Sequence, residues 1–431
     1  MKFFIPCQAL KEESLMIYRI TKSDFFNKLI YICVVLACLA PKYYDSVLRL
    51  PIGLRVSFYT VFVVATWFLF VRIVVVHKKI ESYIFLVWLF FLIVNVWRVE
   101  QIGAWGYFVV WIVTALLFQQ IVYFQANNET FNIIIKAVVD GLFIQLLLGL
   151  YEITTHRYLF EIGDVIFKSN RLYGNVAISM FRNLNDYATF VMTMCPFAVY
   201  KYFEQQGILK KVYYGAISLL SIFMLIRSES RAVVLTIIVL LAFLLYLNYK
   251  KSAQNKIVLS FACVIILFSF LLLPSLQQVV VNILEHNFIN PESGSDSARI
   301  NLIKNGLYFL FETYGFGVGA GNLVVWLGQK SVYDIGGLLF IHNWYVEILV
   351  TFGILFFLVY VVFHVKVLLN LYKKIDKTKV WSKNNTILIS FLAFSIVCIS
   401  SSSNFSAEWV WMYFSWISMY SLSLGKKIMG N

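Results

Sequence analysis

Charge is the property that this sequence has least of. Asp, Glu, Lys and Arg together make up 13% of the 431 residues, hydrophobic residues make up 61%, and the mean hydropathy is +0.78. A soluble domain normally contains about 25% charged residues. A chain this apolar would expose hydrophobic patches that are too large for water. The composition therefore excludes a soluble protein and predicts a polytopic integral membrane protein.

Paired cysteines and clustered metal ligands are also missing. None of the six cysteines forms a Cys-x-x-Cys pair, which argues against a disulfide framework and against a zinc site. The histidines are scattered along the chain and suggest no metal cluster. No Asp-x-Asp motif is present, so the usual metal site for a nucleotide-sugar donor is lacking. We therefore expect neither a metal nor a cofactor.

The N-terminal apolar run and the net positive charge each have a simple interpretation. The apolar run over residues 3–7 is too short for the core of a signal peptide, and charged residues follow it, so we expect no cleavage. The net charge is +14, but most lysines lie in short runs between apolar stretches. That pattern is typical of the positive-inside rule, so we expect no nucleic-acid partner.

Long hydrophobic runs are abundant. A helix needs about 20 apolar residues to cross the hydrocarbon core. The sequence predicts about twelve such segments, near residues 29–41, 56–76, 82–97, 104–124, 131–151, 186–200, 212–226, 232–247, 257–274, 346–367, 385–402 and 408–424.

Lysine placement predicts the orientation of these segments. Lysines gather in residues 368–384, in residues 250–256 and at Lys426 and Lys427. Under strict alternation the three groups fall on one side, which should be the cytoplasm, together with both termini.

The expected architecture is all-α, with about twelve transmembrane helices. Residues 1–274 hold the first nine, with an external loop near 152–185. Residues 275–345 form a large extracytoplasmic loop, and residues 346–431 hold the last three helices. Within the large loop, the spacing predicts an amphipathic helix over 276–284. A second helix is expected to start at Ser295 or Asp296 and to run through Phe311.

Three arginines on the predicted external side are candidates for binding a phosphate. Arg227 and Arg231 are four residues apart, hence on one helix face, where two guanidinium groups suit a bidentate grip on phosphate. They are equally interpretable as anchors that reach lipid headgroups. Arg299 lies near the start of the expected loop helix, where a cation opposes the helix dipole unless an anion binds there. An ordinary solvated arginine is the alternative.

Four glycines alternate with other residues over 315–321, and a stretch that begins with a histidine ends the loop. The glycine run matches no nucleotide-binding motif, and its composition favours a compact turn over direct ligand binding. His342 precedes Asn343, Trp344 and Tyr345 at the predicted membrane boundary. His342 is a candidate general base that Asn343 and Tyr345 are available to orient. The alternative is an interfacial aromatic belt with an incidental histidine.

In this order, the features resemble the O-antigen ligase and polymerase family (Wzy and WaaL type). The resemblance spans about residues 183–355, and the first half of the chain matches only in hydropathy. One departure is Ala232, where family members commonly have glycine. The motifs that carry the resemblance are Asn183–Tyr187 before a segment with Pro196, Ser228–Arg231, Arg299, the glycine run, and His342–Glu347 leading to Gly353.

The resemblance implies a GT-C-like membrane bundle with an external active site. It also implies metal-independent, inverting glycosyl transfer from a glycan carried on a polyprenyl diphosphate. Such a donor brings its own leaving group, and fixed arginines stabilise the charge that develops on it. His342 is the expected base, and Arg227, Arg231, Arg299 and Glu347 are the expected substrate-binding residues.

We therefore expect a polymerase of lipid-linked repeat units of a capsule, exopolysaccharide or O-antigen in a bacterial inner or plasma membrane. A chain-length regulator and a flippase of the same pathway are the expected further partners. The alternatives are a ligase that moves the glycan to another acceptor, a flippase or secondary transporter, and a non-catalytic scaffold. Basic residues in the loop near 152–185 favour a polymerase slightly, because it must hold two diphosphates.

Overall fold

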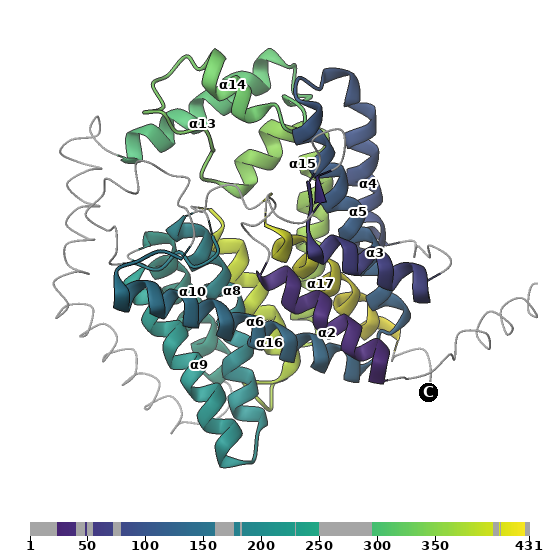
Figure 1. Ribbon diagram of the computed structural model, residues 1–431, viewed down its shortest axis with the longest axis vertical. Coiled ribbons are helices and arrows are strands. Elements are labelled where there is room, and N and C mark those ends of the chain that lie inside the picture. Colours follow the sequence, from purple (N-terminus) through teal and green to yellow (C-terminus); the bar gives the residue numbers. More distant parts are fainter. Residues whose placement is uncertain are drawn as a thin grey trace, which may run out of the picture.

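The computed structural model describes residues 24–39, 48–49, 55–71, 79–159, 176–181, 183–228, 230–249, 295–399, 405 and 407–426 (Figure 1). The all-α class is confirmed for this part of the chain, apart from a two-residue ribbon of β1 (Leu48–Arg49) and β2 (Arg55–Val56). The helices are α2 (Asp24–Leu39), α3 (Phe58–Phe70), α4 (Ile80–Val94), η1 (Val96–Arg98), α5 (Ile102–Phe124), α6 (Asn128–Thr155), α8 (Leu184–Glu204), α9 (Ile208–Arg227), α10 (Arg231–Tyr249), α13 (Ser295–Glu312), α14 (Leu323–Lys330), α15 (Trp344–Tyr372), α16 (Lys383–Val397) and α17 (Glu408–Lys426).

Short polar side chains mark where several of these helices begin. A serine or asparagine at the cap position accepts a hydrogen bond from a backbone N–H of the first turn, which has no partner within the helix. The caps of this kind are Ser57, Asn127, Asn183, Asn343 and Ser382. Asn183 therefore opens α8, as the sequence predicted.

Membrane-type helices dominate the described residues. By length and composition α5, α6, α9 and α15 can each cross a membrane, and five shorter helices are also apolar. Each of the predicted segments within the described residues overlaps one helix, with shifts of a few residues at the ends. The predicted span 257–274 and the amphipathic helix 276–284 lie outside the described residues. The molecule is thus an α-helical membrane protein.

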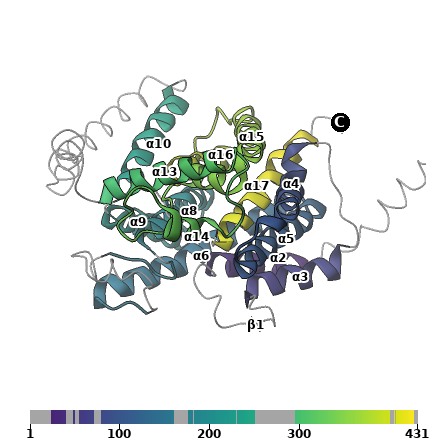
Figure 2. The same ribbon diagram turned by 90° about the horizontal axis from the view of Figure 1, so that it is seen from above.

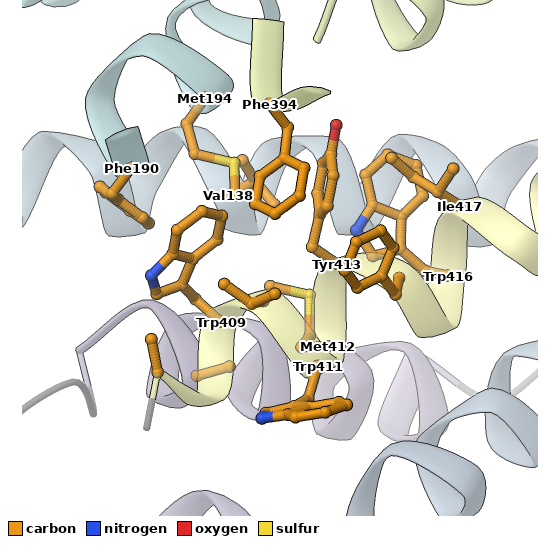
Figure 3. Packing of buried hydrophobic residues seen from close by; sticks show 14 of the residues in the cluster. Val138, Phe190, Met194, Phe394, Trp409, Trp411, Met412, Tyr413, Trp416 and Ile417 are labelled. Carbon is orange, nitrogen blue, oxygen red and sulfur yellow. The ribbon is translucent and has the colours of Figure 1, made fainter. Parts of the chain in front are cut away.

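Helix α17 occupies the centre of the bundle. It packs against α2, α4, α5 and α15, and Figure 2 shows it between the α2–α5 group and the α15–α16 pair. A helix that is apolar on all sides belongs in such a position. Trp409, Trp411, Tyr413 and Trp416 are all fully buried. Figure 3 shows these rings among Phe190 and Met194 of α8 and Phe394 of α16.

Several helix ends meet at one end of the bundle, which we call the lysine end. The Trp381 ring, just before α16, stacks on Phe203 of α8 with a centroid distance of 6.0 Å. Lys383 Nζ donates to the Asn128 carbonyl at the start of α6 at 3.4 Å. The described lysines of this end include Lys28, Lys79, Lys201, Lys210, Lys211, Lys373, Lys374, Lys377, Lys379 and Lys383.

The last turns of α10, α15 and α17 also reach the lysine end. Tyr246 and Tyr372 share a hydrogen bond of 3.3 Å, and the Tyr420 hydroxyl donates to Asn384. These are the helix ends that precede or carry the three predicted lysine groups, and all three lie at one end of the bundle.

Candidate active site

His342 lies in the short stretch that leads into α15, and its neighbours hold that stretch in place. The Trp344 amide donates to the Cys398 carbonyl at 3.2 Å, and the Tyr345 hydroxyl donates to the Ser395 carbonyl at 2.8 Å. The Asn343 side-chain oxygen accepts from the amides of the first turn of α15, at 3.1 Å each. His342 itself is half-buried. The histidine thus stands on a backbone fixed to the end of α16, as a catalytic group requires.

The residues after His342 hold the backbone of the neighbouring helices. The Asn343 oxygen and the Tyr345 hydroxyl, which the sequence offered for orienting the imidazole, bond the backbone of α15 and α16. A helix start leaves its first amides without partners, so an asparagine placed there caps the helix. Trp344 is fully buried, donates to the Tyr360 hydroxyl at 2.8 Å and stacks on Phe405 at 4.5 Å. It belongs to the core and not to an interfacial belt.

Glu347 lies in the first turn of α15, with its residue only 5% exposed. A carboxylate in that position is favoured by the positive end of the helix dipole. Its amide also donates to the Asn343 carbonyl at 2.9 Å, which ties it to the same cap. Glu347 and His342 therefore sit on either side of one helix start.

Helix α15 is broken at Gly353, whose backbone angles are φ 85° and ψ 174°. The break frees backbone groups that the glycine run satisfies. Val318 N donates to Val350 O at 2.8 Å, Gly319 N to Thr351 O at 3.0 Å, and Ile354 N to Gly315 O at 2.9 Å. Irregular backbone within a membrane bundle is tolerated only where protein groups satisfy it in this way.

The glycine run is thus a compact turn, as predicted, and its contact with the helix break explains its composition. Gly315, Gly317, Gly319 and Gly321 all have positive φ, between 78° and 90°. A Cβ at Gly317 would lie 2.6 Å from the Gly353 backbone nitrogen. Only glycine combines that conformation with so close an approach.

Asn322 connects the glycine run to the segment between α4 and α5. Its Nδ2 donates to Arg98 O at 2.7 Å and to Val318 O at 2.8 Å, and its Oδ1 accepts from Glu100 N at 3.1 Å. Nearby, Trp326 Nε1 donates to Glu100 at 2.8 Å. Burial lowers the pKa of Arg98, which stays a cation at neutral pH. Sequence reasoning missed this connection, because its two sides are over 200 residues apart.

Residues 295–341 form a folded cap over this end of the molecule, seen with α13 and α14 at the top of Figure 1. Its small core includes Leu302, Phe309 and Leu327 and reaches Val350 of α15. Asn305 is fully buried and bonds the backbone of Val332 and Tyr333. The predicted loop helix is confirmed as α13, whereas α14 was not predicted.

The arginine pair requires a correction. Arg227 ends α9 and Arg231 begins α10, so the two residues do not share one helix face. The turn between them holds buried Ser228 and Ser230. Ser228 Oγ donates to the Leu225 carbonyl at 2.7 Å, and serine hydroxyls that bond nearby backbone compete with helix continuation. Both arginine side chains are exposed.

Arg299 is the fifth residue of α13, which begins at Ser295, and it is half-buried. The sequence predicted Arg299 in the first turn of this helix. In the structure it lies slightly beyond the free backbone amides of that turn. Helix α13 packs directly against α15, the helix that His342 precedes. Arg299 and His342 thus belong to neighbouring elements.

Helix directions place the arginine turn at the same end of the bundle as His342. Helices α8 and α9 pack as an antiparallel hairpin, so Arg227 lies at the end where α8 starts. Helix α16 starts beside the end of α8, at Trp381 and Phe203, and it therefore finishes near the start of α8. The end of α16 bonds the amide of Trp344, so His342 and Glu347 also lie at this end, opposite the lysines. All five predicted site residues therefore lie at one end of the bundle: Arg227, Arg231, Arg299, His342 and Glu347. We call it the His342 end.

A carboxylate that the sequence did not single out orders this end as well. Glu152 near the end of α6 is buried and accepts from the amides of Ile178 and Ser179 at 2.9 and 2.7 Å. Ser179 Oγ also donates to Gln145 at 2.5 Å. These bonds fix the chain just before α8. Glu152 therefore has a structural role. The only sign of that role in the sequence was a single glutamate within an apolar run.

The comparison with known families covers these features. Residues 216–361 match the Wzy_C family, described as O-antigen ligase. The matched range includes the arginine turn, Arg299, the glycine run, His342 and the break in α15. This match supports the resemblance of the chain to the O-antigen ligase and polymerase family that the motifs predicted.

A curated relative agrees with this assignment. Over 286 residues the chain is 29% identical to the teichuronic acid biosynthesis protein TuaE of Bacillus subtilis (strain 168). The alignment covers 62% of this chain and 56% of TuaE, so the chain spans about half the length of that relative.

Proposed function

We propose that this protein is an extracytoplasmic glycosyltransferase that polymerises oligosaccharide repeat units carried on polyprenyl diphosphate. One observation carries the proposal: the family match contains Arg227, Arg231, Arg299, His342 and Glu347, and the helix directions bring all five to one end of the bundle. In this proposal the His342 end faces outward and the lysine end faces the cytoplasm, as the positive-inside rule favours.

The proposed reaction forms one glycosidic bond and breaks one bond to phosphate. The acceptor hydroxyl oxygen attacks the anomeric carbon, and the polyprenyl diphosphate leaves with the electron pair of the broken C–O bond. His342 takes the hydroxyl proton, a task suited to a group that titrates near neutral pH. Arginine guanidinium groups stabilise the charge that grows on the leaving diphosphate. The free energy released when the bond between sugar and diphosphate is broken drives the transfer. The proposed mechanism requires no metal.

The product is proposed to be a cell-envelope polysaccharide of a bacterial plasma membrane. The likeness to a protein named for teichuronic acid biosynthesis supports this product class. A flippase that delivers the lipid-linked unit and a chain-length regulator are the proposed partners.

A ligase that transfers the finished glycan to another acceptor is the second candidate, because the matched family is described as O-antigen ligase. Purified full-length protein with a lipid-linked repeat unit and no nucleotide separates the two. A polymerase yields a ladder of lipid-linked products from that substrate alone. A ligase yields product only when a second acceptor is added, and a flippase, a transporter or a scaffold yields none.

A further inference from the structure

A pocket opens at the lysine end, far from the candidate active site. It has a volume of about 720 Å³ and lies between the end of α8, the start of α9 and the connection from α15 to α16. Its cationic lining comes from α9, from the connection and from the start of α16: Lys211, Lys379 and Lys383, respectively. The glycosyl-transfer proposal assigns no role to this pocket.

The carboxylates that line the pocket are engaged by other groups. Glu204 accepts from Lys201 Nζ at 2.5 Å and from the Tyr200 hydroxyl at 2.7 Å. Asp376 Oδ1 accepts from Thr378 N at 2.7 Å, from Thr378 Oγ1 at 2.6 Å and from Lys379 N at 3.2 Å, all within its own turn. The negative charges are therefore partly satisfied locally. Lys211, Lys379 and Lys383 all line the open space, and Lys383 Nζ also donates to the Asn128 carbonyl at 3.4 Å.

Two further features of the pocket suit an anion. Helix α16 begins at Lys383 after the Ser382 cap, and a helix start carries partial positive charge. The Phe203 and Trp381 rings stack nearly parallel, with 6° between their planes, and form one wall. Trp side chains are typical of the interface between membrane and water.

Exposed apolar side chains lie next to the pocket in the sequence. Phe203 of the lining is 58% exposed, and on either side of Lys211 at the start of α9, Leu209 is 82% exposed and Val212 is 62% exposed. Helix α9 is long and apolar enough to cross a membrane, so its first turn lies at a membrane boundary. An occupant that combines a negative headgroup with acyl chains matches both the cationic interior and these apolar side chains.

We propose that this pocket binds the anionic, phosphate-bearing headgroup of a membrane phospholipid, with its acyl chains along the first turn of α9. Basic pockets between membrane helices are known to bind anionic headgroups in this manner. Bound lipid would tie α8, α9 and the connection between α15 and α16 together at this end. The proposal stands independently of the reaction at the His342 end.

The test compares two triple variants of the full-length protein in nanodiscs. The pocket variant carries Lys211→Gln, Lys379→Gln and Lys383→Gln. The control variant carries Lys210→Gln, Lys373→Gln and Lys377→Gln, which removes the same charge from the same end but from exposed positions outside the lining. Binding of fluorescent phosphatidylglycerol and phosphatidylcholine is measured for each, with inorganic phosphate as a competitor.

Each lysine near an anionic lipid contributes about fivefold in binding, so the pocket variant should lose about a hundredfold in affinity for phosphatidylglycerol. The control should retain wild-type affinity within a few-fold, and wild type should prefer phosphatidylglycerol to phosphatidylcholine. Equal binding by the two variants, or no preference between the two lipids, overturns the proposal. Displacement of the lipid by millimolar inorganic phosphate would show a site for free phosphate and would also overturn it.

Discussion

The backbone of Gly353 and the Cα of Gly317 approach so closely that a Cβ on Gly317 would lie 2.6 Å from the Gly353 nitrogen. This contact joins the glycine run of the cap to the break in α15. Since α15 begins directly after His342, the contact also fixes the position of the candidate base relative to the cap.

Gly317→Ala should therefore destabilise the cap more than substitution of a glycine that lacks this contact. The change adds positive-φ strain of about 1–2 kcal/mol and an overpacking cost of about 1–3 kcal/mol. Gly337→Ala is the matched control, because Gly337 has the same φ of 78° but nothing within 4 Å of its added Cβ. Thermal unfolding in detergent should show the larger loss for Gly317→Ala, and equal losses would contradict the importance of the contact.

Asn322→Ala should destabilise the cap by leaving several backbone groups without their partners. The side chain satisfies the carbonyls of Arg98 and Val318 and the amide of Glu100. An unsatisfied buried group costs about 1–3 kcal/mol. Asn301→Ala, which removes one exposed bond to Asp334 O, is the control and should cost less. Proteolysis of the cap at rising temperature measures the difference, and indistinguishable rates would exclude the proposed connection.

The sequence predicted most of the described helices but not how they are interrupted. Hydropathy over about 20 residues identifies a span because the bilayer sets its length. The break at Gly353 has no local signal beyond one glycine, since its hydrogen-bond partners lie over 30 residues earlier in the chain. The predicted spans 212–226 and 232–247 left the turn at Ser228 between them, but the shared face of Arg227 and Arg231 was wrong, because it requires one helix to continue through both positions.

The candidate site was predicted as residue types, and the structure supplies their placement. His342 and Glu347 were recognisable beside a helix start, yet the roles of Asn343 and Tyr345 in holding α15 and α16 depend on tertiary contacts. Asn322 and Glu152 resembled any other polar residue in the sequence. Their importance comes from backbone groups of distant segments, which a single sequence does not reveal.

Topology can be tested by labelling with an impermeant thiol reagent. The four described cysteines are buried, so a background in which Cys7 and Cys263 are serine should label weakly. In whole cells, Val332→Cys in the cap should react and Thr378→Cys at the lysine end should not. Both positions are exposed. The reverse labelling would place the His342 end in the cytoplasm and would exclude an external active site.

Arg231→Ala and Arg299→Ala should each remove most polymer formation while the protein still accumulates in the membrane. Loss of one donor to a developing anion costs about 2.7–4 kcal/mol, or about 10²–10³ in rate. Lysine should rescue poorly, because it lacks the planar fork of arginine. Lys304→Ala on the same helix as Arg299 is the control, since Lys304 is exposed, and should stay within about twofold. Near-normal elongation by either alanine variant would show that the arginine concerned anchors the protein in the membrane and does not bind the diphosphate.

The pH dependence of elongation tests the central claim, that His342 is the general base. A base must be neutral to accept a proton, so wild-type activity should fall as pH drops through the range in which histidines ordinarily titrate, about 6.5. His342→Gln should lower the rate by about 10²–10⁴ and should abolish the acid limb in the remaining activity, because an amide cannot take the proton.

His156→Asn is the matched control for this measurement. His156 is an exposed histidine in a left-handed conformation at the end of α6, a conformation that asparagine tolerates. The control should keep both the wild-type rate and the acid limb. The account predicts that only His342→Gln loses both, whereas a glutamine variant that retains substantial activity together with the acid limb would contradict it.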